Sequence, residues 1–269
     1  MGDVVFQVNG LSKRFGRIAA LEDVSFQVRA SEVLGLIGPN GAGKSTLFEC
    51  LAGVLPSDRG TLSARGKAIL VNDRASLLFY VPDGIAPWPE QSVRWALDFT
   101  IGFLGGQRSR YASRRVHNPP RAASLPHIRN DRDGILALRE EVIEQLDLRA
   151  LLGQPVGALS KGQRKRVLLG IGLLTQQPVL LIDEPFEGLD LRQARDIAAV
   201  LRRHVDRGRT LFLSIHQISD AARLCDRFVL LSSGRVRGEG TVSELAALAA
   251  GHGSSMARQD LEEVFLALT

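Results

Sequence analysis

The sequence has few cysteines and no long uninterrupted apolar run. Cys50 and Cys225 are the only two cysteines among 269 residues, too few and too far apart for a disulfide framework or a cysteine metal site. The longest apolar tract, residues 167–182, is interrupted by polar residues and Pro178, and no charged segment followed by an apolar one opens the chain. We therefore expect neither a membrane span nor a signal peptide, and we expect a cytoplasmic location.

The composition is that of an ordinary globular protein. Hydrophobic residues make up 45% of the chain and charged residues 23%, which excludes disorder throughout and supplies a substantial core. A length of 269 residues suits one large domain or a domain with a subdomain.

One segment carries the whole net charge of +5. Residues 105–133 contain seven arginines and two aspartates, a difference of +5, together with three prolines and little apolar periodicity. This pattern predicts a loop or a disordered insert rather than a packed element. Such inserts can bind nucleic acid or anionic lipid. Tyr111 is the only aromatic residue among these arginines, and nucleic-acid sites usually interleave aromatic and basic residues. We therefore prefer a solvated loop and do not expect nucleic acid as a partner.

The most informative stretch joins a predicted strand, 33–37, to a predicted helix. Its residues are Gly38, Pro39, Asn40, Gly41, Ala42, Gly43, Lys44, Ser45 and Thr46. The glycines let successive N–H groups point into one concavity, where the helix N-terminus adds positive potential. Lys44 would reach the β- and γ-phosphates of a nucleotide, and the Ser45 hydroxyl would bind Mg²⁺. A loop that merely turns strand into helix is disfavoured, because the whole pattern occurs in the context that it needs.

Apolar patterns predict the remaining elements. Residues 4–8 predict a strand and 11–16 a turn, and 21–28 alternate as a strand with one exposed face does. The other predictions are a strand at 78–81, a helical region from about 91, an amphipathic helix over 135–146, a helix over 164–174, buried strands at 179–182 and 211–215, and a closing hairpin over 228–236.

Two carboxylates, Asp183 and Glu184, directly follow the predicted strand 179–182. They would lie at the carboxyl end of a central strand, where open α/β sheets bind ligands. Asp183 would hold Mg²⁺ through its water shell, and Glu184 would accept a proton from the water that attacks the γ-phosphorus. His216 follows the strand 211–215 in the same way. A single histidine is more often structural, but this position favours a γ-phosphate contact that orients the water.

Together these motifs resemble the nucleotide-binding subunit of an ATP-binding cassette (ABC) transporter, from residue 4 to about 248. Residues 159–163, Leu-Ser-Lys-Gly-Gln, resemble the family's signature, with Lys161 where a glycine is commonest. Residues 188–190 resemble the loop that links two subunits. Glu184 stands at the place of the general base.

The resemblance also implies roles that the residues alone do not establish. His216 matches the switch histidine, and Phe15 occupies the place of an aromatic that stacks on adenine. Ser160 and Gly162 would complete the ATP site of the opposite subunit, with Ser160 also able to serve as a helix N-cap. The active unit would then be a dimer with a second copy or a paralogous ATPase subunit, and a lone chain would hydrolyse ATP poorly.

One position departs from the family pattern. Where the family has a glutamine after a strand, linking Mg²⁺ and water to the membrane partner, this chain has Asp83. An aspartate is shorter and anionic. It would ligate Mg²⁺ directly, repel the γ-phosphate or face away, and the sequence does not choose among these alternatives.

The predicted fold is α/β, a P-loop NTPase core of the ABC type with an N-terminal antiparallel β portion and an α-helical subdomain at about 86–165. We expect an ABC ATPase domain over 1–248, carrying the basic insert 105–133, and a C-terminal helical tail over 249–269.

The predicted function is ATP hydrolysis that powers a transporter whose membrane-spanning permease subunits are separate polypeptides, with ATP and Mg²⁺ as ligands and this chain peripheral at the cytoplasmic face of the membrane. The tail, 260–269, is similar to that of bacterial ABC-2 and drug-exporter ATPases and favours export. One alternative, a soluble ABC protein of ribosomes or DNA, is disfavoured by the single cassette and an insert without heptads. Another, a regulatory nucleotide-binding protein with little turnover, is kept open by Asp83.

Overall fold

Two β-sheets form the centre of the protein in the computed structural model, which describes residues 3–111, 132–251 and 261–268. The larger sheet has the strand order β10-β9-β3-β8-β7-β6. Its strands are β3 (Val33–Ile37), β6 (Leu78–Val81), β7 (Val179–Asp183), β8 (Thr210–Ser214), β9 (Arg227–Ser232) and β10 (Arg235–Gly240). β10 runs antiparallel to β9, and the other neighbours are parallel.

The smaller sheet is antiparallel, with the order β2-β1-β4-β5. Its strands are β1 (Val4–Phe15), β2 (Ile18–Arg29), β4 (Arg59–Ala64) and β5 (Lys67–Ala68). The predicted turn over 11–16 is wrong, because β1 continues through this segment to Phe15. The register with β2 shifts at several points, and Gly10 adopts φ +61°, so the strand bends at bulges and continues pairing.

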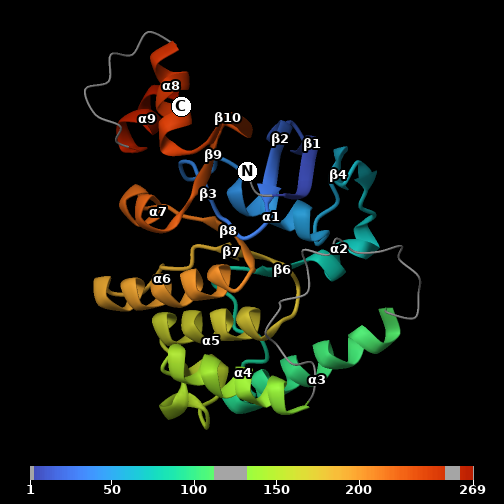
Figure 1. Ribbon diagram of the computed structural model, residues 1–269, viewed down its shortest axis with the longest axis vertical. Helices are drawn as coiled ribbons and strands as arrows, with labels where there is room; N and C mark the ends of the chain where they lie inside the picture. The colour runs from blue at the N-terminus through green and yellow to red at the C-terminus, as the bar shows by residue number, and fades with distance from the viewer. Residues whose placement is uncertain (1–2, 112–131, 252–260, 269) are drawn as a thin grey trace.

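Helices cover both faces of the larger sheet, and Figure 1 shows α3, α4 and α5 on the face opposite β1 and β2. Their bounds are α1 (Lys44–Ala52), α2 (Val71–Leu77), α3 (Val93–Tyr111), α4 (Arg132–Gln145), α5 (Lys161–Leu174), α6 (Leu191–Asp206), α7 (Ile218–Leu224), α8 (Val242–Gly251) and α9 (Leu261–Leu268), with short 3-10 turns at Arg149–Leu151 and Val156–Ala158. None of the helices in the described ranges has the length and apolarity needed to span a bilayer.

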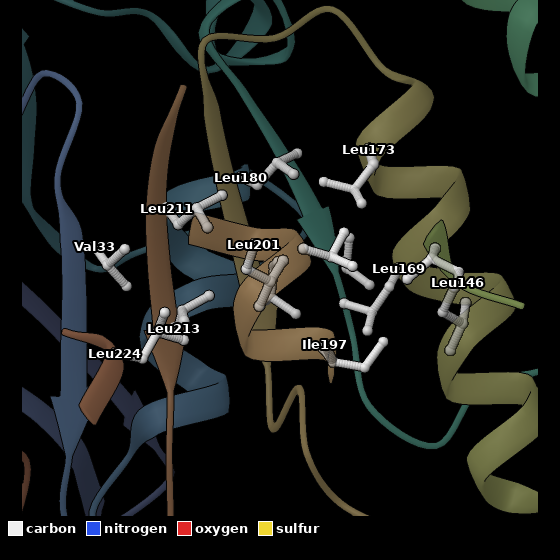
Figure 2. Close-up of a cluster of buried hydrophobic side chains, with 14 of the residues drawn as sticks. Val33, Leu146, Leu169, Leu173, Leu180, Ile197, Leu201, Leu211, Leu213 and Leu224 are labelled. Carbon is white, nitrogen blue, oxygen red and sulfur yellow. The ribbon is translucent and has the colours of Figure 1, made fainter. Parts of the chain in front are cut away.

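Alternate residues of each central strand enter two different cores. In β7, Leu180 and Ile182 belong to the cluster formed with α3 to α9, while Val179 and Leu181 belong to the cluster formed with β1, β2 and α1. Figure 2 shows strand residues of the first cluster, among them Leu180, beside leucines of α5 and α6. Because both faces are covered, the strand reads as a continuous apolar run rather than an alternating one.

The junction of α5 and β8 contains a fully buried cation. Arg209 is 1% exposed, and its guanidinium donates hydrogen bonds to the carbonyl oxygens of Leu173 (2.8 Å), Gly172 (3.2 Å) and Thr175 (2.8 Å) at the end of α5. These carbonyls have no further helical turn to bond to, and the helix dipole favours a positive charge there. Arg209 therefore closes the C-terminal end of α5.

Three predicted boundaries differ in the structure. Residues 105–111 of the basic insert belong to α3 and residues 132–133 to α4, so the predicted loop is helical at both of its ends. The rest of the insert, residues 112–131, lies outside the described residues. The predicted tail boundary at 248 lies within α8, and α9 occupies 261–268. The predicted helix at 164–174 starts three residues earlier.

Candidate active site

Three neighbouring parallel strands bring the predicted site residues to one edge of the sheet. β3 precedes the glycine-rich loop, β8 precedes His216, and β7 ends in Asp183, followed by Glu184. The order β3-β8-β7 places the ends of these strands side by side, although residues 37 and 183 are far apart in sequence. The carboxyl edge of a parallel sheet is where ligands of such folds bind.

Glycines fix the path of the loop from β3 to α1. A Cβ on Gly38 would lie 2.2 Å from the carbonyl oxygen of Leu231, and one on Gly43 would lie 2.5 Å from that of Ala20. Gly41 and Gly43 also have φ values of +81° and +103°, which larger residues rarely adopt. Gly43 is the N-cap of α1 and makes no side-chain cap, so the first turn keeps backbone N–H groups for an anion.

Lys44 is held over this loop. Its side chain donates hydrogen bonds to the carbonyl oxygens of Gly38 (2.8 Å) and Pro39 (3.3 Å). Burial lowers the pKa of Lys44, while the carboxylates of Glu184 and Asp183 act in the opposite direction. The ammonium thus lies between the glycine-rich loop and the two acids, where it can contact a polyphosphate.

Two of the three predicted metal ligands, Ser45 and Asp183, lie together. The Ser45 hydroxyl donates a hydrogen bond to a carboxylate oxygen of Asp183 at 2.8 Å. The Tyr80 hydroxyl donates to the same oxygen at 3.3 Å, and the Ser214 hydroxyl donates to the other. A hydroxyl and a carboxylate are hard oxygen ligands of the type that Mg²⁺ prefers, usually completed by phosphate and water. This donor set fits Mg²⁺.

Glu184 and His216 form a pair at the same edge. Glu184 Oε1 lies 3.0 Å from Nε2 of His216, and the backbone N–H of His216 donates to Oε2 at 3.2 Å. Burial raises the pKa of Glu184 to about 7, opposed by Lys44 and assisted by Asp183. Burial also lowers the pKa of His216, with Lys44 adding to the effect. A carboxylate with a pKa near neutrality is suited to accept a proton.

Glu184 adopts an unusual backbone conformation. Its φ is +49°, in the left-handed region that non-glycine residues seldom occupy. The backbone N–H of Glu184 donates to the carbonyl oxygen of Ser214 (3.2 Å) and to its hydroxyl (3.1 Å). These bonds to β8 offset the cost of the conformation and direct the carboxylate toward His216.

Phe15, the predicted adenine platform, lies at the surface at the end of β1. Its side chain is 49% exposed, and Lys13 Nζ is 5.6 Å from the ring centroid. Phe15 pairs with Ile18 across the hairpin, and Ala20 of the same hairpin contacts Gly43. The hairpin that carries the ring therefore borders the glycine-rich loop.

The signature residues begin α5. Ser160 is its N-cap and forms a capping box with Gln163. A Cβ on Gly162 would approach the carbonyl oxygen of Gly188 at 2.8 Å, so this glycine allows α5 to pack closely against the loop after β7. Lys161 forms an ion pair with Glu187 of that loop. The signature thus contacts the segment that follows the two acids.

Asp83 takes a different partner from the expected metal. Its carboxylate forms an ion pair with Lys165 of α5, whereas Ser45 and Asp183 bond to each other. The structure thus gives Asp83 a cationic partner on α5, and its role toward Mg²⁺ stays a prediction.

Sequence reasoning did not identify three polar residues at the site. Ser214 bonds to Asp183 and Glu184, Tyr80 bonds to Asp183, and Lys165 bonds to Asp83. The position of Ser214 was a usable signal, since it is a polar residue at the end of an apolar run and two residues before His216. Lys165 had no comparable signal.

Comparison with known proteins gives the family. The family model for the ABC transporter matches residues 21–187. The chain belongs to this family. It is 33% identical over 247 residues to the hemin import ATP-binding protein HmuV of Streptomyces coelicolor, covering 91% of this chain and 81% of that protein. It is 32% identical over 252 residues to the daunorubicin resistance ATP-binding protein DrrA3 of Streptomyces coeruleorubidus, covering 92% and 71%.

A further relative and a solved structure agree. The Nod factor export ATP-binding protein I of Ralstonia nicotianae is 32% identical over 243 residues, with 90% of this chain and 68% of that protein covered. A structure of the ATP-binding subunit of an ABC transporter matches with a TM-score of 0.77 and 26% identity over 98% of both chains. The prediction of a P-loop ABC fold is confirmed, and this ABC chain is an ATP-binding subunit and an ATPase.

Proposed function

We propose that this ATPase hydrolyses Mg²⁺-bound ATP with Glu184 as general base, and that the hydrolysis drives export through a separate permease. The observation that carries the proposal is the contact of Ser45 with Asp183 at 2.8 Å beside the Glu184–His216 pair at 3.0 Å. A candidate metal position and a candidate base thus lie side by side, next to Lys44.

Each group at this edge has a chemical role in the proposal. The N–H groups at the start of α1 and the ammonium of Lys44 bind the β- and γ-phosphates. Ser45 and Asp183 hold Mg²⁺, which neutralises charge on the same phosphates when bound. Glu184 takes the proton of the attacking water, and His216, bonded to the Glu184 carboxylate, contacts the γ-phosphate and keeps the carboxylate oriented.

The working unit in this proposal is a dimer at the cytoplasmic face of a membrane. Gly162, at the start of α5, is partly exposed beside the loop 188–190, and Ser160 is exposed. These groups suit binding of a second subunit's nucleotide. Phe15, exposed beside the glycine-rich loop, suits stacking on the adenine. The other ATPase subunit is a second copy of this chain or a paralogue, and the permease is a separate chain.

Export is the direction we favour. Two relatives at 32% identity are named for daunorubicin resistance and for Nod factor export. The ending 260–269 has the residue pattern that resembles drug-exporter ATPases. The relative named for hemin import, at 33% identity, argues for the opposite direction. A transport assay, rather than sequence similarity, therefore tests the direction.

The test compares ATP turnover of the parent, of Glu184→Gln and of Lys44→Ala. Glu184→Gln keeps the shape of the side chain but cannot take a proton, so ATP binding is retained and turnover falls about 100-fold or more. Lys44→Ala loses affinity for ATP. Equal turnover of parent and Glu184→Gln would refute the general base. Negligible ATP turnover of the parent, even when its permease subunit is added, would favour the alternative of a regulatory nucleotide-binding protein.

A further inference from the structure

Four charged side chains connect the start of α5 to the ends of β6 and β7. Lys161 and Lys165 lie one turn apart on α5, on the same side of the helix. Lys165 pairs with Asp83 after β6, Lys161 pairs with Glu187 after β7, and the Glu187 carboxyl lies close enough to that of Asp83 to influence its ionisation. We call these four residues the clasp.

The innermost member of the clasp is Lys165. Its side chain is 2% exposed, whereas that of Asp83 is 26% exposed. A buried ammonium without a counter-charge is costly, so the position of Lys165 depends on the carboxylate of Asp83. Lys161 and Glu187, by contrast, are about half exposed, and their pair contributes little by itself.

Lys165 reaches the catalytic backbone. Its ammonium donates a hydrogen bond to the carbonyl oxygen of Asp183 at 3.2 Å. That carbonyl belongs to the same peptide unit as the N–H of Glu184, which donates to Ser214 at 3.2 and 3.1 Å. The peptide is thus held from both sides, and its orientation sets the φ of +49° at Glu184.

We propose that Asp83 is a positioning residue for ATP hydrolysis, which acts by holding Lys165 against the Asp183 carbonyl. The inference rests on the proposed role of Glu184 as general base. Loss of the Asp83 charge frees Lys165, the peptide unit turns, and the Glu184 carboxylate leaves its place beside His216. Small displacements of a catalytic group reduce the rate strongly. Asp83 on this account is not a ligand of Mg²⁺.

The experiment is a double-mutant cycle with Asp83→Asn, Lys165→Gln and the combined variant. Turnover is measured against ATP and against Mg²⁺ concentration on the purified full chain. We expect Asp83→Asn to lower kcat about tenfold or more, with KM for ATP and the half-saturating Mg²⁺ concentration unchanged. The combined variant should regain at least about threefold, because it removes the unpaired buried charge and keeps hydrogen-bonding groups.

Asp147→Asn is the matched control. Asp147 pairs with the adjacent residue of α5, Arg166, at 3.0 Å but is 86% exposed, so its loss should leave kcat unchanged. Should Asp83→Asn not fold, Asp83→Glu keeps the charge and should stay within about threefold of the parent.

Three results would overturn the inference. The first is a higher Mg²⁺ concentration needed for half-maximal turnover in Asp83→Asn, which the added Lys165→Gln substitution does not lower. The second is a kcat of Asp83→Asn equal to that of Asp147→Asn. The third is a tenfold lower kcat in Asp83→Glu. Failure of the proposed function is a separate result, since it would appear as equal turnover in the parent and Glu184→Gln.

Discussion

The pH dependence of stability should contain a contribution from one buried histidine. His204 lies in the last turn of α6 with 6% of its surface exposed, and its Nε2 has no hydrogen-bond partner among the described residues. Burial lowers the pKa of His204 from 6.5 to about 3, and the positive charges of Arg209, Arg207 and Arg203 act in the same direction. The folded protein therefore keeps His204 neutral at pH values where the unfolded chain protonates it.

The sign and size of the effect follow from linkage. The unfolded state binds the extra proton, so the stability associated with neutral His204 is complete above pH 6.5 and is lost as the pH falls toward 3. Between pH 7 and pH 5, His204 of the unfolded chain gains about 0.7 of a proton and that of the folded chain almost none. This costs about 2 kcal/mol of unfolding free energy.

His204→Gln removes this titration, and the assay is the melting temperature of parent and variant at pH 7 and pH 5. Other groups, including Glu184, titrate in both proteins and cancel in the comparison. The parent should lose about 4–8 °C more than the variant between the two pH values. His216→Gln is the control, because His216 is 44% exposed and the shift should be smaller. Equal losses in parent and His204→Gln would refute the reasoning.

Three further predictions concern single residues. Lys44→Ala should weaken ATP binding at least tenfold in a titration, since a cation leaves the polyphosphate site. Arg209→Ala should lower the free energy of unfolding by about 3 kcal/mol, measured by urea denaturation, because buried carbonyls lose their donors and a cavity forms. Gly38→Ala should lower both stability and ATP affinity, since its Cβ would meet the carbonyl oxygen of Leu231 at 2.2 Å. Gly153→Ala is its comparison and should change neither, because no atom lies within 4 Å of the added Cβ and the φ of Gly153 is not in the left-handed region.

The apolar strands and the residues that end them could be predicted from the sequence. The run 179–182 is buried on both faces, so its pattern was unambiguous, and the acids after it had to lie at a sheet edge. The length of β1 could not be predicted in the same way. Bulges interrupt its alternation near Gly10, and only pairing with β2 and β4 keeps the segment extended.

Contacts between polar residues that are distant in the sequence could not be predicted, for another reason. Lys165 and Asp83 are 82 residues apart, and Arg209 bonds to carbonyls more than 30 residues away. No periodicity or spacing joins such positions, because their meeting depends on how α5 packs on the sheet. The sequence shows that residue 83 is an aspartate, but the effect of Asp83 on Glu184 depends on its ion pair with Lys165, which only the structure shows.

The order of strands determines whether Asp83, which replaces the glutamine common in the family, can influence ATP binding or ATP hydrolysis. β6 is an edge strand and pairs with β7, while the glycine-rich loop follows β3, which is two strands beyond β7 in the sheet. Val81 of β6 lies beside Ile182 of β7, so Asp83 and the two acids leave the sheet next to each other. Asp83 therefore acts on the peptide that carries Glu184, and among the described residues it forms its ion pair with Lys165 of α5 rather than with the loop that binds phosphate. A change at Asp83 should alter the rate of hydrolysis and leave ATP affinity nearly unchanged, in contrast to a change at Lys44.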